Sequence, residues 1–252
     1  MNITSIINQK GGVGKTTTSI NLAAGLAMQG KNVLLIDLDP QAHSTSGLGV
    51  ELEKGQPAIS DVFEHSKNIA DTIINTKVKN LFLVPSRIRL DKTEQIISTA
   101  NFRESLLHKA IKNLSYDFII VDCRPTLGTL TVNALYASNY IIVPCEMSKY
   151  SLDGFSDLMD TIDTIENNDS NGKKRYLRIL ITKFDSRTTT TNEWIFKQLE
   201  PFLNLMFETK TRKNEALNQA SIIAEPIFTA SPGSNGAEDY KKLISEFLTL
   251  CQ

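Results

Sequence analysis

The chain has 252 residues, of which 41% are hydrophobic and 22% are charged, and its formal net charge is −1 at pH 7. These values are ordinary for a soluble globular protein. Its three cysteines lack a CxxC or other metal-ligand spacing, and their odd number argues against a disulfide framework. No segment approaches the roughly 20 apolar residues of a membrane span, and the apolar N-terminus is too short for a signal peptide. We therefore expect a cytoplasmic protein.

Short, continuously apolar segments recur along the chain, as expected of strands that are buried on both faces. They are Ile3–Ile7, Asn32–Asp37, Leu81–Pro85, Asp117–Asp122, Tyr140–Pro144 and Tyr176–Thr182. Helical patterns cover Thr16–Gln29, Phe102–Leu114, Ser151–Glu166, Asn192–Leu199 and Ala237–Leu250. Strands that alternate with helices predict an α/β fold, with a mostly parallel twisted sheet and helices on both faces. Because no linker, repeat or low-complexity segment interrupts this pattern, we expect a single domain over residues 1–252.

The turn after the first predicted strand has the sequence GGVGKTT and opens the first predicted helix. This context is typical of a P-loop. Glycines let backbone N–H groups turn inward around phosphate, and the positive end of the helix adds to the attraction. Lys15 would reach the β- and γ-phosphates, and the Thr16 hydroxyl would be a Mg²⁺ ligand. The predicted nucleotide-binding residues of this turn are Gly11, Gly12, Val13, Gly14, Lys15, Thr16 and Thr17.

Carboxylates follow two further predicted strands. Asp37 and Asp39 end the second strand, and Asp122 ends the segment Asp117–Asp122. Because parallel strands end at one edge of a sheet, these side chains should lie near the P-loop. There a carboxylate can hold Mg²⁺ directly or through water, and a second one can orient the attacking water. Aspartates also cap strands and form turns without any such role.

Four segments resemble the ParA/MinD ATPases, whose fold is of the SIMIBI type of P-loop NTPases. KGGVGKTT resembles their deviant Walker A motif, DLDPQAHSTSGLG the segment after their second strand, and YDFIIVDCRPTLG their Walker B and switch II. EPIFTASPGSNGAEDYKKLISEF resembles their closing strand, turn and helix. The resemblance covers essentially the whole chain and is closest to the small ParA proteins, called Soj in chromosomal systems, which partition plasmids or chromosomes.

The resemblance implies a role for Lys10, the second lysine of the loop. In the family this lysine reaches the ATP of a partner subunit, so that two chains enclose two nucleotides. Lys10 and Lys15 would then act catalytically, together with Asp39, which would position the water. Thr16, Asp37 and Asp122 would support Mg²⁺. One departure is visible, because Arg124 replaces a proline of the usual DCPP sequence; we expect it to make switch II less rigid.

ParA dimers of this kind bind DNA without sequence preference, and a ParB-like adaptor stimulates ATP hydrolysis. Residues 171–213 contain ten basic residues and four acids, which favours a DNA-binding face. The candidates are Arg187, Lys210, Arg212 and Lys213. A solvated, lysine-rich surface is the alternative reading of this composition. The resemblance places the protein in the cytoplasm, on the nucleoid.

Several alternatives belong to other classes. A MinD-like membrane role is disfavoured because this chain stops close to its last predicted helix. A larger ParA with an N-terminal helix-turn-helix domain is disfavoured because this chain starts one strand before its P-loop. Neither the cysteines nor the histidines have metal-ligand spacing. A ParA-like ATPase that positions a protein cargo, such as a microcompartment or a chemoreceptor cluster, would use the same chemistry. A metabolic P-loop phosphoryl transferase would need neither Lys10 nor a basic face.

Overall fold

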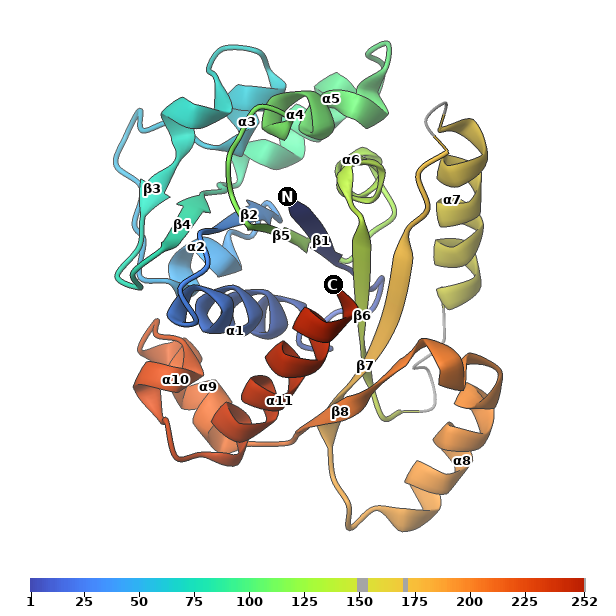
Figure 1. The fold of residues 1–252 in the computed structure, drawn as a ribbon. Helices are drawn as coiled ribbons and strands as arrows, with labels where there is room; N and C mark the ends of the chain where they lie inside the picture. Colours follow the sequence, from blue (N-terminus) through green and yellow to red (C-terminus); the bar gives the residue numbers. More distant parts are fainter. Residues whose placement is uncertain (149–153, 170–171, 252) are drawn as a thin grey trace.

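The structure is a computed structural model that describes residues 1–148, 154–169 and 172–251. Eight strands of the described residues form one sheet in the order β3-β4-β2-β5-β1-β6-β7-β8 (Figure 1). Every neighbouring pair is parallel except β3 with β4. The strands are β1 Asn2–Ile6, β2 Val33–Leu38, β3 Ile74–Asn75, β4 Leu81–Val84, β5 Phe118–Cys123, β6 Tyr140–Glu146, β7 Tyr176–Phe184 and β8 Met206–Arg212. This is the mostly parallel sheet that the sequence predicts.

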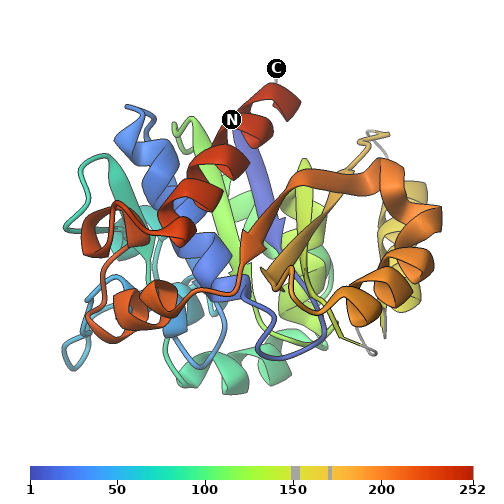
Figure 2. The ribbon, with the colours of Figure 1, turned by 90° about the horizontal axis from the view of Figure 1, so that it is seen from below.

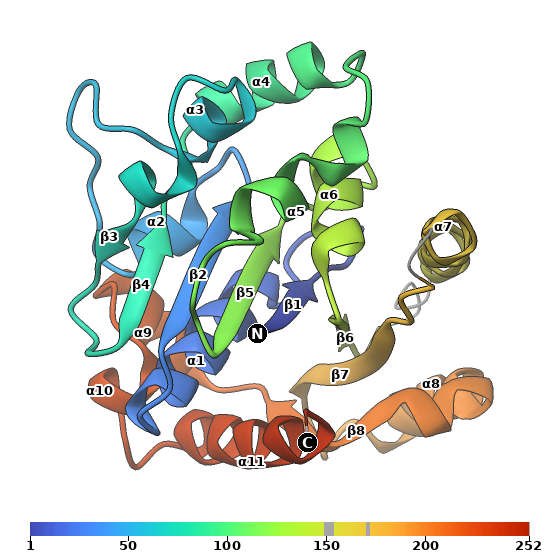
Figure 3. The ribbon, with the colours of Figure 1, turned by 45° about the horizontal axis from the view of Figure 1, so that its top comes forward.

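Helices cover both faces of the sheet (Figure 3). The α-helices are α1 Lys15–Met28, α2 His43–Gly47, α3 Ile59–Phe63, α4 Arg89–Ile97, α5 Leu106–Ile111, α6 Thr129–Ala137, α7 Phe155–Asn168, α8 Thr189–Leu199, α9 Glu215–Ile222, α10 Ile227–Ala230 and α11 Asn235–Leu250. Shorter 3₁₀ turns are η1 Ile69–Thr72, η2 Arg103–Ser105 and η3 Glu200–Leu205. Along β2, Leu34 and Ile36 face the core under α3 to α7, whereas Val33 and Leu35 face the core under α1, α10 and α11. The alternation of strand side chains thus builds two apolar layers.

The predicted strands agree with β1, β2, β4, β5, β6 and β7 to within a few residues. One prediction is wrong: the closing strand expected after Glu225 is the short helix α10, which begins directly after Pro226. Proline lacks a backbone N–H and suits the start of a helix, whereas it would remove a hydrogen bond from a strand. The helix expected from Ser151 is α7, and residues 151–153 of that prediction lie outside the described residues.

The outer edge of the sheet is β8, and Figures 1 and 2 place α8 beyond it, away from α1 to α4. Carboxylates of α11 occupy its backbone donors: Glu246 accepts from the N–H groups of Glu208 and Thr209 at 2.7 and 3.0 Å. Asp239 accepts from the N–H of Arg212 at 2.8 Å. The edge strand is therefore hydrogen-bonded on both sides. No helix among the described residues has the length and apolarity to cross a bilayer.

Candidate functional site

The P-loop connects the buried strand β1 to α1, at the edge of the sheet where the parallel strands end. Gly12 and Gly14 have φ values of 74° and 91°, which only glycine adopts readily. A side chain built at Gly11 or Gly12 would meet no atom within 4 Å, so the space in front of the loop is open. Gly14 is the N-cap of α1, and the free N–H groups of the first helical turn face this space. The loop is shaped to receive an anion.

The two lysines of the loop point in different directions. Lys15 is 8% exposed and donates from Nζ to the carbonyl oxygen of Lys10 at 2.9 Å. Burial lowers the pKa of Lys15, and the nearby Asp122 opposes this change. The Lys10 ammonium instead donates to Ser148 Oγ at 2.6 Å and lies 4.0 Å from Glu146 Oε2, beyond the end of β6. Only Lys15 therefore lies within the phosphate loop of its own chain.

Asp122 is the centre of a buried hydroxyl cluster. Its carboxylate accepts from Thr16 Oγ1 at 2.8 Å, from Ser19 Oγ at 2.9 Å and from Ser44 Oγ at 2.7 Å. Burial raises the pKa of Asp122, and these three hydrogen bonds lower it. Thr16 gives its proton to the carboxylate and keeps its oxygen lone pairs, which suit a hard cation such as Mg²⁺. A hydroxyl beside a carboxylate therefore fits the donor set that Mg²⁺ needs.

Asp37 lies beside Asp122 in the register of β2 with β5. One of its oxygens accepts from the N–H and the hydroxyl of Thr45 at 2.8 and 2.7 Å, and the other from the N–H of Asp39 at 3.2 Å. Burial and the charge of Asp122 raise the pKa of Asp37 to about 7. Asp39 is half-buried and accepts from the Gln41 N–H at 2.9 Å. The structure thus brings the three predicted aspartates to one edge, with Asp39 the more accessible.

The hydroxyls of Ser19, Ser44 and Thr45 were not among the site residues predicted from the sequence. All three are buried, at 4% exposure or less. A signal for two of them is present, because HSTS begins four residues after Asp39, where α2 follows the end of β2. No group of three or more His, Cys, Asp or Glu side chains in the described parts of the chain could hold a metal by itself. A cation bound at this edge of the sheet would therefore also need hydroxyl oxygens as ligands.

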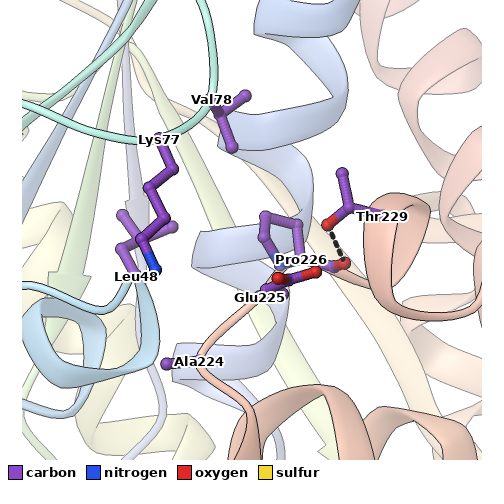
Figure 4. Close-up of a pocket in the computed structure, with 7 residues that line it drawn as sticks. All are labelled: Leu48, Lys77, Val78, Ala224, Glu225, Pro226 and Thr229. Atoms are coloured by element: carbon purple, nitrogen blue, oxygen red, sulfur yellow. Dashed lines mark hydrogen bonds between the residues drawn. The ribbon is translucent and has the colours of Figure 1, made fainter.

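Two cavities border the P-loop, and the smaller of them, of about 480 Å³, is lined by Thr16, Thr17, His43 and Leu217 among others. The larger, of about 840 Å³, extends from Gly14 and Thr17 along the ends of β7 and β8, to Asp185, Asn214 and Tyr240. This volume is adequate for the base and ribose of a nucleotide whose phosphates rest on the P-loop. A third cavity, of about 200 Å³, lies between residues 48, 77 and 78 and residues 224–226 and 229, and includes no residue of the P-loop (Figure 4).

The four candidate DNA contacts have different environments. Arg212 is ion-paired with Asp239 at 2.6 Å and with Glu238 at 2.7 Å, and these carboxylates raise its pKa. Arg187 is 85% exposed and paired with Asp185 at 2.7 Å.

The other two candidates are lysines. Lys210 lies 4.4 Å from the centre of the Phe196 ring. Lys213 lines the larger cavity together with Arg187 and Arg212. Three of the four candidates therefore surround the cavity beside the P-loop, and Lys210 does not line it.

Comparisons with known proteins cover nearly the whole chain. A family model described as an AAA domain matches residues 1–179. The sporulation initiation inhibitor protein Soj of Bacillus subtilis is 38% identical over 246 residues, which are 97% of each chain. The chromosome partitioning protein ParA of Myxococcus xanthus is 36% identical over 248 residues, 98% of this chain and 87% of that protein.

Solved structures give the same fold. A cobyrinic acid a,c-diamide synthase of Mycobacterium smegmatis, with bound ADP and magnesium, has a TM-score of 0.84 and 28% identity, covering 98% of this chain and 94% of that one. A plasmid partition protein of Borrelia burgdorferi, bound to AMPPNP, has a TM-score of 0.82 and 25% identity and covers 98% of each chain. McdA of Cyanothece has a TM-score of 0.87 and 22% identity, covering 98% of this chain and 99% of that one. This comparison shows a similar fold only.

Proposed function

Because the chain belongs to the ParA/Soj family of partition ATPases and is a P-loop ATPase, we propose that it drives the ATP-dependent partition of a plasmid or a chromosome. In this proposal residues 1–252 act as one ATPase domain. ATP closes two copies into a dimer that encloses two nucleotides. The dimer binds DNA without sequence preference, and a ParB-like adaptor on the cargo stimulates hydrolysis and release. The protein would work in the cytoplasm, on the nucleoid.

The position of Lys10 carries the proposal. Its ammonium is directed away from its own P-loop, onto Ser148 and toward Glu146, and its side chain is 30% exposed. A cation that does not serve its own phosphate loop is available to the nucleotide of a second copy. There it would stabilise charge on the triphosphate only when the dimer is closed. ATP binding thereby becomes the condition for dimerisation, and hydrolysis removes that condition.

The other site residues have separate parts in this proposal. Lys15 and the backbone of residues 11–17 bind the phosphates, and Mg²⁺ would be supported by Thr16, Asp37 and Asp122. When bound, Mg²⁺ neutralises charge on the phosphate oxygens. Asp39, at the open end of β2, would hold the attacking water. Support comes from the short hydroxyl–carboxylate bonds around Asp122 and from relatives in solved structures that hold ADP or AMPPNP.

DNA would be bound through phosphates, by Lys213 and Arg187 beside the larger cavity and by weaker contributions from Lys210 and Arg212. Contacts of this kind depend strongly on salt and ignore base sequence. The adaptor determines which cargo is moved, because the ATP-driven dimer would be the same for a DNA cargo and for a protein cargo. An identified adaptor partner would separate these two cases.

The proposal is tested by a gel shift on random-sequence duplex DNA, with no nucleotide, with ADP and with a slowly hydrolysed ATP analogue, at two salt concentrations. We expect binding with the analogue alone and loss of binding at the higher salt. Size-exclusion chromatography of Lys10→Ala with the analogue should show a monomer, because the cation supplied to the partner is missing. A Lys10→Ala dimer as stable as the wild type would overturn the assigned role of this lysine.

A second candidate is an ATP-dependent synthetase with a small acceptor, which the 28% identity to the cobyrinic acid a,c-diamide synthase favours. This function predicts fast ATP turnover that depends on the acceptor and is indifferent to DNA. It also predicts that Lys10→Ala keeps most of its activity. The measurement that separates the two is phosphate release with and without random duplex DNA, for the wild type and Lys10→Ala together.

A further inference from the structure

The loop between β5 and α6, residues 124–128, begins two residues after Asp122 and contains the one visible departure from the family motif, Arg124. From the sequence, we expect this replacement to make the loop less rigid. The structure shows instead that Arg124 is held in place: its side chain is 20% exposed, and its Nη1 donates to Asp91 Oδ1 at 3.1 Å and to the Glu94 carboxylate. The side chain therefore connects the loop to α4.

Glu94 also holds the far end of the same loop. Its Oε1 accepts from the N–H of Leu130, in the first turn of α6, at 3.1 Å. A side chain at position 128 would collide with this oxygen, so Gly128 lets the loop approach the carboxylate. Glu94 is itself only 15% exposed. A single carboxylate thus holds residues on both sides of the loop that follows the Asp122 strand.

The helix that bears Glu94 is itself well anchored. Leu90 of α4 is fully buried. Arg89 of the same helix is ion-paired with Glu64 at the end of α3, and Thr93 Oγ1 donates to Glu64 at 2.6 Å. The Arg124–Glu94 contact therefore attaches the loop to a fixed element, which is what a positioning interaction requires.

We propose that Arg124 and Glu94 are positioning residues that fix the loop after Asp122 by an ion pair, where the family's usual sequence fixes it by a proline ring. Proline restricts a chain by limiting its unfolded conformations. A charge-assisted arginine–carboxylate contact restricts it by bonding to a neighbour. The loop then keeps the end of β5, and with it the Asp122 carboxylate, in one position while ATP is hydrolysed. The inference uses the ATPase activity alone and does not depend on partition or on DNA binding.

The test compares steady-state ATP hydrolysis by Arg124→Gln, Glu94→Gln, Arg124→Lys and Arg124→Pro. Gln at position 94 keeps an acceptor for the Leu130 N–H and removes the charge that holds Arg124. We expect Arg124→Gln and Glu94→Gln each to lower kcat about 5- to 10-fold with KM for ATP within about twofold, because the P-loop is untouched. Arg124→Lys should retain about half of kcat or more, since it keeps the charge. Arg124→Pro should stay within about twofold of the wild type, because the ring replaces the ion pair.

The double variant Arg124→Pro/Glu94→Gln makes the test specific. With proline at position 124, the Glu94 charge has no arginine to hold, so Glu94→Gln should cause no further loss of kcat. Lys92→Gln is the matched control, since it removes an exposed charge of the same helix that neither touches the loop nor anchors α4, and we expect an unchanged kcat.

Two results would overturn the inference: an unchanged kcat in Arg124→Gln, or equal losses of kcat in Arg124→Gln and Lys92→Gln. If Arg124→Pro does not fold, the comparison of Arg124→Gln with Arg124→Lys decides, and equal rates in these two would reject the ion pair.

Discussion

The strand-end cluster around Asp122 and the basic segment 171–213 both stand out in the sequence, and the structure treats them differently. In the cluster, residues separated by up to about a hundred positions converge on one carboxylate, with Thr16 and Ser44 at 2.8 and 2.7 Å. In the basic segment, charges that are close in sequence each contact a separate partner. Lys174 pairs with Glu166, and Arg175 is buried against Asp169.

The other basic residues of the segment show the same dispersion. The partners are the carbonyl oxygen of Ala137 for Lys173, that of Leu177 for Arg178, Glu146 for Lys183, Asp185 for Arg187, the Phe184 and Phe196 rings for Lys210, and Asp239 for Arg212. Within the part of the chain that the structure describes, Lys197 and Lys213 are the two whose ammonium groups make no hydrogen bond, ion pair or ring contact, although the charge of Lys213 helps to lower the pKa of Asp185. A motif with fixed spacing predicts a geometry, whereas a local excess of charge predicts only a composition.

The largest effect should come from the cluster. Asp122→Asn replaces the carboxylate that accepts three hydroxyl protons with an amide that has a single acceptor oxygen and no charge. We expect ATP hydrolysis to fall about 100-fold or more. The measurement is phosphate release at saturating ATP, and Asp160→Asn, an exposed carboxylate on α7, is the matched control. Activity within a few-fold of the wild type would show that the cluster is a structural feature only.

The next effect should come from Arg212 and should appear in stability. Arg212→Ala leaves Asp239, which is 5% exposed, with the backbone N–H as its remaining partner here. Since Arg212 is 38% exposed and partly screened by solvent, we expect a loss of about 1–2 kcal/mol in the free energy of unfolding, measured by urea denaturation. Arg187→Ala, which removes an exposed pair, should leave the unfolding midpoint nearly unchanged. Equal losses of unfolding free energy in Arg212→Ala and Arg187→Ala would contradict the distinction between structural and surface charges in this segment.

A smaller effect concerns Lys173, whose ammonium donates to the Ala137 carbonyl at 2.8 Å. Burial, with the charge of Arg175, lowers the pKa of Lys173 to about 8 from 10.5. The unfolded chain therefore binds more protons between these values, and stability rises with pH across this window. Lys173→Met should lack this rise, so the wild type should gain stability relative to the variant from pH 8 to 10. The free energy of unfolding is measured by urea denaturation at several pH values. Parallel curves of this free energy against pH for the wild type and Lys173→Met would refute the prediction.

The smallest effect should belong to Lys213. Lys213→Ala should weaken binding to random duplex in the presence of an ATP analogue about threefold, and lower the slope of log affinity against log salt by about one. Lys210→Ala should change affinity by less than twofold, because Phe184 and Phe196 engage its ammonium. Fluorescence anisotropy over a salt series measures both. A larger loss for Lys210 than for Lys213 would move the proposed DNA face from the residue after β8 to β8 itself.

The sequence predicted most of the sheet because its central strands are continuously apolar, as in FIIVDC of β5, which is buried throughout. It missed β8, whose sequence MFETKTR is polar and only partly buried, since an edge strand need not be apolar on both faces. It also missed α6, a short helix whose apolar residues give no clear helical period.

The site shows the same limit. The aspartates could be predicted from strand ends, because parallel strands end at one edge of the sheet. The contact of Arg124 with Glu94 joins positions 30 residues apart and has no local pattern. A pairwise contact of this kind depends on the packing of α4 against the loop, so it becomes visible only in three dimensions.

The carboxylates that cap β8 have a consequence for self-association. Glu246 and Asp239 occupy the outward N–H groups at positions 208, 209 and 212, and the opposite edge of the sheet is the two-residue strand β3. Among the described residues, neither edge therefore offers a long uninterrupted row of free N–H donors of the kind that templates cross-β aggregation. The proposed cycle of dimer formation and release would therefore produce a free monomer whose sheet edges are protected against amyloid-like growth.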